Sequence, residues 1–239
     1  MAAPGQPAPG PAPAAPVGLP LAWQGGALVL RPEGALHLPE HGALLIADFH
    51  LGKAHSFRRL GVPVPAGTTE HMLNRLDALL GQVEARHLVF LGDFLHAALA
   101  QASPALARFA AWRAARPALA MTLVRGNHDD RAGDPPPSLA MAVVDEPWPL
   151  GPWRLCHHPL KPVALAGPQA PPRIAGHWHP AAVLRGAARD HLRLPCFCLS
   201  ERQLVLPAFG AFTGMHTVGP APGLRRYVSD GQRLHALPD

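Results

Sequence analysis

Five apolar runs along this chain each lead into a short stretch of Asp, Asn or His side chains. The stretches are Asp48-Phe49-His50, Gly92-Asp93, Gly126-Asn127-His128-Asp129, His157-His158-Pro159 and Gly176-His177-Trp178-His179. In α/β proteins, site residues follow the carboxyl ends of strands, where neighbouring strands bring them together. The order of these stretches therefore favours an α/β fold with one shared site.

Strands and helices are expected to alternate in the first half of the chain. Apolar residues recur at three- and four-residue steps from Thr68 to Glu84, which predicts a helix that Thr68 or Thr69 can cap. A second helix is expected over 104–115. Strands are predicted at 27–30, 35–38, 43–48, 87–93 and the start of 119–129, then at 140–144, 153–157, 173–176, 181–185, 192–199 and 203–206, with a hairpin at Asp230-Gly231. Two packed mixed β-sheets flanked by α-helices fit this order.

The composition of the chain sets its expected organisation. Its 239 residues, 48% of them hydrophobic, can bury a full core. Residues 1–20 are almost wholly Ala, Pro and Gly and lack the apolar segment of a secretory signal, so we expect a disordered tail followed by a single catalytic domain over 21–239. Pro or charge interrupts every apolar run before the ~18 residues of a membrane helix, so no membrane association and a cytoplasmic location are predicted.

The net charge and the cysteine content say little about the function of the chain. The net charge of +5 attracts phosphate backbones, but the wealth of Ala, Pro, Gly and Arg can equally arise from GC-rich coding. The cysteines Cys156, Cys196 and Cys198 are too few for a disulfide framework, which agrees with a reducing compartment. Cys196 and Cys198 are expected to be buried core thiols rather than a metal site.

The five stretches offer oxygen and imidazole ligands that suit two divalent cations such as manganese, iron or zinc. Two neighbouring cations need a shared carboxylate, a role that suits Asp93. One cation is expected to be held by Asp48, His50 and His179, and the other by Asn127, His157 and His177. His157 is preferred to His158 because its spacing to Pro159 matches related sites, which leaves His158 as a substrate contact.

Each stretch alone has an ordinary explanation. A buried Asp or His is as often a hydrogen-bonded core or capping residue as a ligand. A chance origin for all five in this order is far less plausible. The set therefore predicts a two-metal hydrolase of phosphate esters, in which metal-bound hydroxide attacks phosphorus in line with the departing oxygen.

The chain resembles the calcineurin-like binuclear metallophosphoesterases from about residue 25 to 215. Within that family it is most similar to the ligase-associated DNA damage response endonucleases, the PdeM group. The strings that carry this resemblance are DFHLGKAHSFRRLGVPVPAGT (48–68), LGDFLHA (91–97), GHWHPA (176–181), LPCF (194–197) and LPAFGAFTG (206–214). The resemblance implies a calcineurin-like α-β-β-α sandwich and a manganese-dependent endonuclease of single-stranded DNA in repair, functionally linked to a DNA ligase and a helicase.

Two residues beside Asn127 are candidates for catalysis. The imidazole of His128 can reach the leaving oxygen without being a ligand, and an ordinary pKa of ~6.5 suits a general acid. Asp129 can orient His128, although a role as a cap of the next turn explains it equally well.

Residues outside the ligand set are candidates for substrate contacts. Lys53, Arg58 and Arg59 follow the first stretch and can meet phosphates that flank the scissile one, although a solvated basic face is the competing explanation. His96 can contact the substrate or donate a hydrogen bond to a ligand.

Three functions remain open on the sequence. The leading one is a single-strand DNA endonuclease. A phosphatase or small-molecule phosphodiesterase of the cyclic-nucleotide type fits the metal motifs equally well. A binding subunit that has lost catalysis is disfavoured by the intact ligand set.

Overall fold

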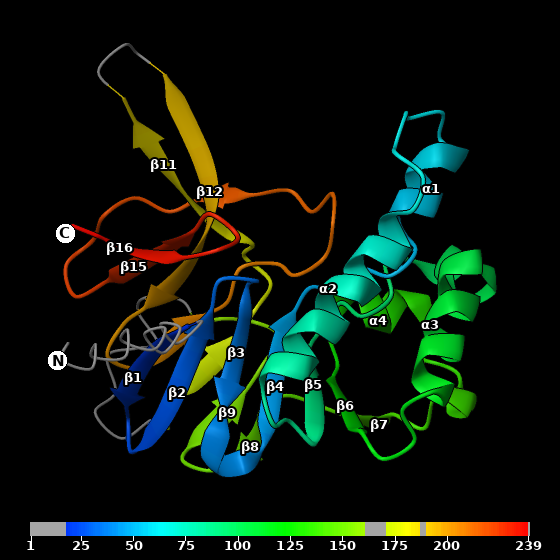
Figure 1. The fold of residues 1–239 in the computed structure, drawn as a ribbon, viewed down its shortest axis with the longest axis horizontal. Coiled ribbons are helices and arrows are strands. Elements are labelled where there is room, and N and C mark those ends of the chain that lie inside the picture. Colours follow the sequence, from blue (N-terminus) through cyan, green and yellow to red (C-terminus); the bar gives the residue numbers. More distant parts are fainter. Residues whose placement is uncertain (1–17, 161–170, 187–189, 239) are drawn as a thin grey trace, which may run out of the picture.

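The structure, a computed structural model, describes residues 18–160, 171–186 and 190–238. Two β-sheets pack face to face, and helices cover the outer face of the first sheet (Figure 1). Both sheets contain parallel and antiparallel pairs. The predicted α/β fold with two packed mixed sheets is therefore confirmed.

The first sheet has seven strands in sequence order, antiparallel from β1 to β4 and parallel from β4 to β7. Its strands are β1 (Leu19–Trp23), β2 (Gly26–Arg31), β3 (Ala35–Leu38), β4 (Ala43–Ala47), β5 (His87–Leu91), β6 (Ala120–Val124) and β7 (Ala142–Val144). The parallel half aligns the carboxyl ends of β4, β5 and β6 at one edge.

In the described part of the chain the second sheet has nine strands, with β15 and β16 joined to the main path through β12. Its strands are β8 (Trp148–Leu150), β9 (Trp153–Leu155), β10 (Arg173–Ala175), β11 (Pro180–Arg185), β12 (His191–Leu199), β13 (Gln203–Val205), β14 (His216–Thr217), β15 (Arg225–Ser229) and β16 (Leu234–Leu237). The parallel pair β9 and β10 directs a second set of carboxyl ends toward those of the first sheet. The predicted hairpin at Asp230-Gly231 joins β15 to β16.

The described helices are α1 (Lys53–Arg59), α2 (Thr68–Gln82), α3 (Pro104–Ala114) and α4 (Asn127–Ala132), with 3-10 turns at Pro39–His41, Ala98–Ala102 and Pro137–Leu139. The two predicted helices appear as α2 and α3. Gly67, rather than Thr68 or Thr69, is the N-cap of α2, and the Thr68 hydroxyl donates to the carbonyl of Pro65. Among the described residues no α-helix follows α4, so no helical layer beside the second sheet is seen there.

Strand alternation divides the core into layers. On β4, Leu44 and Ile46 face the helices, while Leu45 and Ala47 face the second sheet. A small third cluster, which includes Cys196 and Cys198, lies on the other face of β12 from Phe197. All three cysteines are free and buried, and burial of Cys196 and Cys198 was expected.

Some of the predicted segments lie partly outside the described residues. Residues 1–17 of the predicted tail lie outside the described residues, and β1 already begins at Leu19. Residues 161–170, where a Pro- and Gly-rich loop is expected, also lie outside them. Within the described residues, no helix is both long enough and apolar enough to span a bilayer.

Candidate metal centre

The predicted ligands follow the aligned carboxyl ends of both sheets. Asp48 and His50 follow β4, Asp93 follows β5 and Asn127 follows β6. From the second sheet, His157 follows β9, and His177 and His179 follow β10. The backbone N–H of His177 donates to Asp48 Oδ2 over 2.9 Å, which ties the two sheets together at the site.

Several of these residues have an unusual backbone. Asp48, His50, Asp93, His177 and His179 all have positive φ values, between 47° and 70°. In this left-handed region a residue with a Cβ pays roughly 1–2 kcal/mol. Sharp turns of this kind collect at functional sites, because they aim side chains that a regular strand would direct elsewhere.

A first cluster is formed by Asp48, His50 and His179, which place one ligand atom each within 4.8 Å of one another. His179 Nε2 lies 3.3 Å from Asp48 Oδ1. The side chain of His50 is almost fully buried, and neither of its ring nitrogens has a hydrogen-bond partner among the described residues. Burial lowers its pKa, so the ring offers a neutral lone pair. Such an orphaned buried imidazole fits a cation ligand.

A second cluster surrounds His157. Its Nε2 lies 2.9 Å from Asn127 Oδ1 and 2.9 Å from His177 Nδ1. The same Nε2 lies 3.4 Å from Asp93 Oδ1, while Asp93 Oδ2 lies 3.7 Å from His50 Nε2 in the first cluster. The two oxygens of Asp93 therefore face the two clusters, as a bridging carboxylate requires.

The hydrogen bonds of two histidines fix which nitrogen faces the centre. His157 Nδ1 lies 3.1 Å from the Leu91 carbonyl, and His179 Nδ1 lies 2.9 Å from the Gly214 carbonyl. A carbonyl only accepts, so each Nδ1 carries the proton and each Nε2 presents its lone pair inward. Histidine ligands of metals are commonly oriented in this way.

The buried charges of the centre also fit cations. Asp48 and Asp93 are almost fully buried, and no Lys or Arg forms an ion pair with either within the described part of the chain. Two buried carboxylates are costly unless a cation compensates them. The oxygen and imidazole donor set suits divalent manganese, iron or zinc.

His157 and His158 differ in burial and in hydrogen bonding. His157 is fully buried beside Asp93, whereas the His158 side chain is 45% exposed and its Nδ1 lies 2.6 Å from Glu146 Oε1. Glu146 Oε2 accepts from the backbone N–H of both histidines, at 2.6 Å and 2.9 Å. The geometry therefore favours His157 as the ligand and adds Glu146, which the sequence did not single out, as its support.

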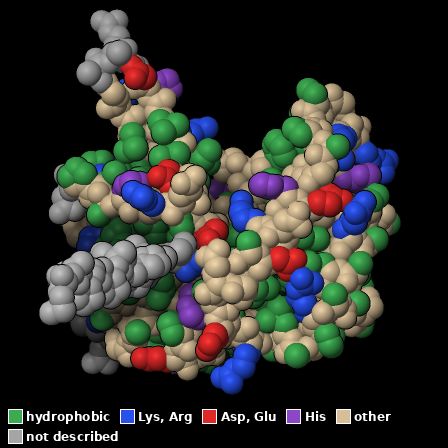
Figure 2. All heavy atoms as spheres, in the orientation of Figure 1, with side chains coloured by type: hydrophobic (Ala, Val, Ile, Leu, Met, Phe, Trp, Pro, Cys, Tyr) green, Lys and Arg blue, Asp and Glu red, His purple; other side chains and the backbone are tan. Residues whose placement is uncertain are grey.

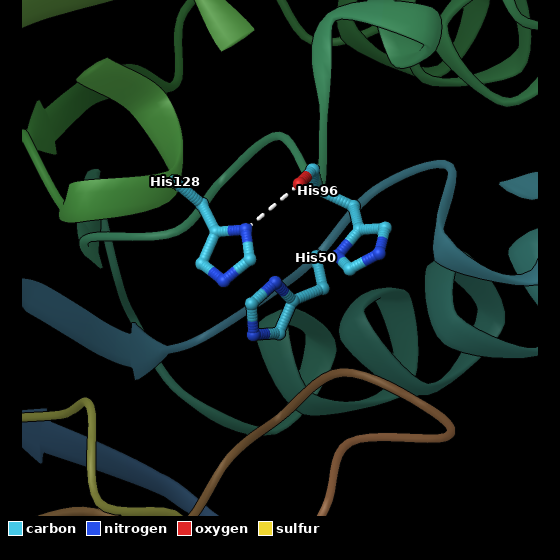
Figure 3. Close-up of side chains that lie close together, drawn as sticks. All are labelled: His50, His96 and His128. Atoms are coloured by element: carbon cyan, nitrogen blue, oxygen red, sulfur yellow. Dashed lines mark hydrogen bonds between the residues drawn. The ribbon is translucent and has the colours of Figure 1, made fainter. Parts of the chain in front are cut away.

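His128 lies beside Asp93 at the edge of the centre. Its backbone N–H donates to Asp93 Oδ1, and its Nδ1 donates to the His96 carbonyl over 2.8 Å. Its Nε2 is 3.9 Å from Asp93 Oδ2. Figure 3 shows His50, His96 and His128 close together, with the dashed bond that holds His128. Burial, followed by Lys53 and His128, lowers the pKa of His96 to about 4.

The prediction that Asp129 orients His128 is wrong. Its Oδ1 accepts from Leu95 N and its Oδ2 accepts from Gly126 N, both at 3.0 Å. No hydrogen bond joins it to His128 among the residues described. Asp129 instead caps α4 and links the turns that follow β5 and β6, which was the alternative explanation.

The basic candidates spread along α1. Lys53 begins the helix near the centre: burial lowers the pKa of its amine, and the nearby carboxylates of Asp93 and Asp48 oppose that shift. Arg58 and Arg59 lie exposed in the last turn. Arg58 lines a cavity of about 170 Å³ with His55 and Arg108. The structure thus brings Lys53 to the centre and leaves Arg58 and Arg59 at its margin.

The chain is similar to proteins of one known family and to several solved structures. The family of calcineurin-like phosphoesterases matches residues 43–185. Among solved structures, Pseudomonas putida nuclease MPE is 44% identical over 92% of this chain and 100% of its own, with a TM-score of 0.79. Yfce, a phosphoesterase from E. coli, is 16% identical over 82% of this chain and 97% of its own, with a TM-score of 0.38. A predicted phosphoesterase from Streptococcus pneumoniae is 15% identical over 79% of this chain and 82% of its own, with a TM-score of 0.30. A search of curated proteins gave no match.

Proposed function

The chain belongs to the calcineurin-like phosphoesterase family, and from this premise we propose that it is a manganese-dependent endonuclease that cleaves single-stranded DNA. Membership makes it a hydrolase that uses divalent metal ions. The proposed substrate is supported by the 44% identity to a bacterial nuclease that the alignment covers completely. The position of Asp93 between the two ligand clusters is the observation that carries the metal chemistry.

We assign the cations to two sets of residues that share Asp93. Asp48, His50 and His179 hold one, and Asn127, His157 and His177 hold the other. When bound, the two cations supply an activated water and neutralise charge on the phosphate. Asn127 would be a neutral ligand, which would leave more net positive charge at its site for the substrate.

The surrounding side chains position the substrate and move a proton. With its Nδ1–H given to the His96 carbonyl, His128 donates from Nε2 to the leaving oxygen in its imidazolium form, in which both ring nitrogens carry a proton. His96 and His158 contact the phosphate from the two sides of the centre. Lys53 offers its amine to a non-bridging phosphate oxygen, and Arg58 and Arg59 meet phosphates farther along the strand. A role in repair beside a DNA ligase and a helicase, and a cytoplasmic location, stay predictions.

The test uses metal-stripped protein with closed circular single-stranded DNA and, separately, bis(p-nitrophenyl) phosphate, each with and without manganese. Closed circles offer no end to an exonuclease. Manganese-dependent linearisation that is lost in Asp93→Ala supports an endonuclease at this site. Ester hydrolysis without cutting of circles would instead assign the centre to a small-molecule phosphodiesterase.

A further inference from the structure

The hairpin of β11 and β12 projects from the second sheet beside the metal centre. Pro180, its first residue, directly follows the proposed ligand His179. Figure 1 shows the hairpin and α1 rising on opposite sides of the molecule, and Figure 2 shows a hollow between these two projections. The hairpin is therefore one wall of the approach to the centre.

The two faces of the hairpin differ in chemistry. On β12, Leu194 and Cys196 lie in the outer apolar cluster, whereas Phe197 lies in the core between the sheets. Because side chains alternate along a strand, Arg193 and His191 point to the same side as Phe197. Arg193 pairs with Val183 and His191 with Arg185, so Arg185 shares that side. This surface, formed by Arg185, His191 and Arg193, is called the basic face below.

The basic face is concave, and its cationic side chains have no acidic partner among the described residues. Its three residues line a cavity of about 590 Å³ together with Val183 and Thr217. Within the described part of the chain, no hydrogen bond or ion pair engages the side chains of Arg185, His191 or Arg193. Cationic groups collected on one concave surface raise the local concentration of anions and favour their binding.

The distance from the centre limits which anion can use both sites. A strand rises about 3.3 Å per residue. Arg193 pairs with Val183, which is four residues after His179, so it lies roughly 13 Å along the hairpin. Arg185 is six residues after His179 and lies roughly 20 Å along it. A small phosphate ester cannot span this length. A polymer with regularly spaced phosphates can occupy the centre and the basic face together.

We propose that the basic face binds the phosphate backbone of single-stranded DNA, several nucleotides from the bond that is cut. This inference rests on the proposed nuclease function and extends its substrate site along β11 and β12. Because backbone contacts carry no sequence information, the face adds affinity and orientation without sequence preference.

The test compares the double variant Arg185→Ala/Arg193→Ala with Arg86→Ala/Arg233→Ala, which removes equal charge elsewhere. Arg86 precedes the amino end of β5, opposite the edge that carries Asp93, and Arg233 lies in the turn between β15 and β16. Affinity for a labelled 30-residue oligothymidylate is measured from 50 to 300 mM salt. Hydrolysis of bis(p-nitrophenyl) phosphate with manganese reports on the centre.

We expect the hairpin double variant to bind the oligonucleotide at least 10-fold more weakly at low salt. Loss of two phosphate contacts should reduce the slope of log K against log salt by roughly 1.4. Ester hydrolysis and cleavage of a trinucleotide should stay within twofold of wild type, since neither substrate reaches the basic face. Unchanged affinity and slope, an equal loss in the control double variant, or a parallel loss of ester hydrolysis would each overturn the inference.

Two further outcomes separate this inference from the proposed function. If wild type cuts circular single strands and the hairpin variant cuts them equally well, only the inference fails. If wild type binds the oligonucleotide through the hairpin but cuts no circles, the proposed function fails and the binding face stands. A loss of affinity for duplex DNA alone would contradict the assignment to single strands.

Discussion

At the scale of single residues, the centre depends on how hydrogen bonds orient its rings. His128 is held at Nδ1 by the His96 carbonyl and at its backbone by Asp93, so its Nε2 is the nitrogen left for a substrate. Under the proposed function, the imidazolium form of this ring donates a proton from Nε2 and His128 is not a ligand of the cations. This distinction can be tested by changing the leaving group.

For His128→Ala we expect both cations to stay bound while DNA cleavage falls by about 100-fold or more, the usual contribution of a general acid. Hydrolysis of bis(p-nitrophenyl) phosphate should fall much less, because p-nitrophenolate leaves without help from a proton. Metal content by mass spectrometry and the two rates decide the outcome. A parallel loss of metal would mean that His128 is a ligand.

Glu146 was not among the residues predicted from the sequence. Although burial raises the pKa of its carboxyl, bonds from His158 outweigh this and hold the pKa below its ordinary value. The charged carboxylate accepts both backbone N–H groups of the His157-His158 turn. It thereby fixes the turn that presents His157 to the centre.

Glu146→Gln should weaken binding of one of the two cations by roughly 10- to 100-fold, as loss of a supporting group around ligands does. His158→Ala is the matched control, because it removes the ring contact but keeps the backbone bonds of Glu146. Titration of metal-stripped protein with manganese, followed by calorimetry, gives both site affinities. Equal losses in the two variants would place the effect in His158 instead.

At the scale of elements, the long helices were predictable and the short helices were not. The helix expected at 68–84 is found as α2, because its apolar residues repeat often enough to define a buried face. α1 and α4 have seven and six residues, too few for a clear period, and packing of the chain around them stabilises helices of that length. The positive φ values at the ligands likewise arise from tertiary structure, since neither Asp nor His requires that conformation.

The ligand turn after β4 is anchored by an aromatic cluster. Phe49, between Asp48 and His50, is fully buried and stacks on Phe94 with ring centroids 5.9 Å apart. Phe109 of α3 contacts both rings, at 5.9 Å from Phe49 and 4.9 Å from Phe94. Helix α3 therefore supports the metal centre without touching it.

Phe109→Ala should reduce the free energy of unfolding by about 3–5 kcal/mol through the cavity it leaves. It should also weaken manganese binding, because Phe49 loses a packing partner. Leu60→Ala is the control: Leu60 is 77% exposed, so a change within about 0.5 kcal/mol is expected. Urea denaturation measures the free energy of unfolding of both variants. A loss of stability with unaltered metal affinity would show that the turn after β4 does not need α3.

At the scale of the whole molecule, the centre joins the two sheets. Asp48, Asp93 and Asn127 come from the first sheet, and His157 and His177 come from the second. Cations bound between them should stabilise the native state by about 2.7 kcal/mol for each site at a concentration 100 times its Kd. Thermal unfolding with and without manganese measures this gain. Asp93→Ala, which removes the shared ligand, should lose most of this gain in stability. If the variant kept the full gain, Asp93 would not be the ligand that the two cations share.

The metal-free protein should also be sensitive to acid. Burial is the first cause of a lowered pKa at His37, His50, His87, His96 and His177. In the unfolded chain these rings titrate near ~6.5. Below that pH the unfolded state binds more protons than the native state, so the free energy of unfolding falls as the pH falls.

His87 isolates this effect from the metal centre, because it lies at the amino end of β5, where its Nε2 is 2.9 Å from Thr122 Oγ1. Between pH 7.5 and 5.5, His87→Gln should lose less stability than wild type, since Gln takes up no proton. His71→Gln, at an exposed position of α2, should follow the wild-type curve. Urea titrations of metal-stripped protein at several pH values provide the comparison. If His87→Gln and wild type lost stability in parallel, the acid sensitivity would have to come from His37 or from the histidines around Asp93, and manganese, which competes with protons for the rings around Asp93, should then suppress their share of it.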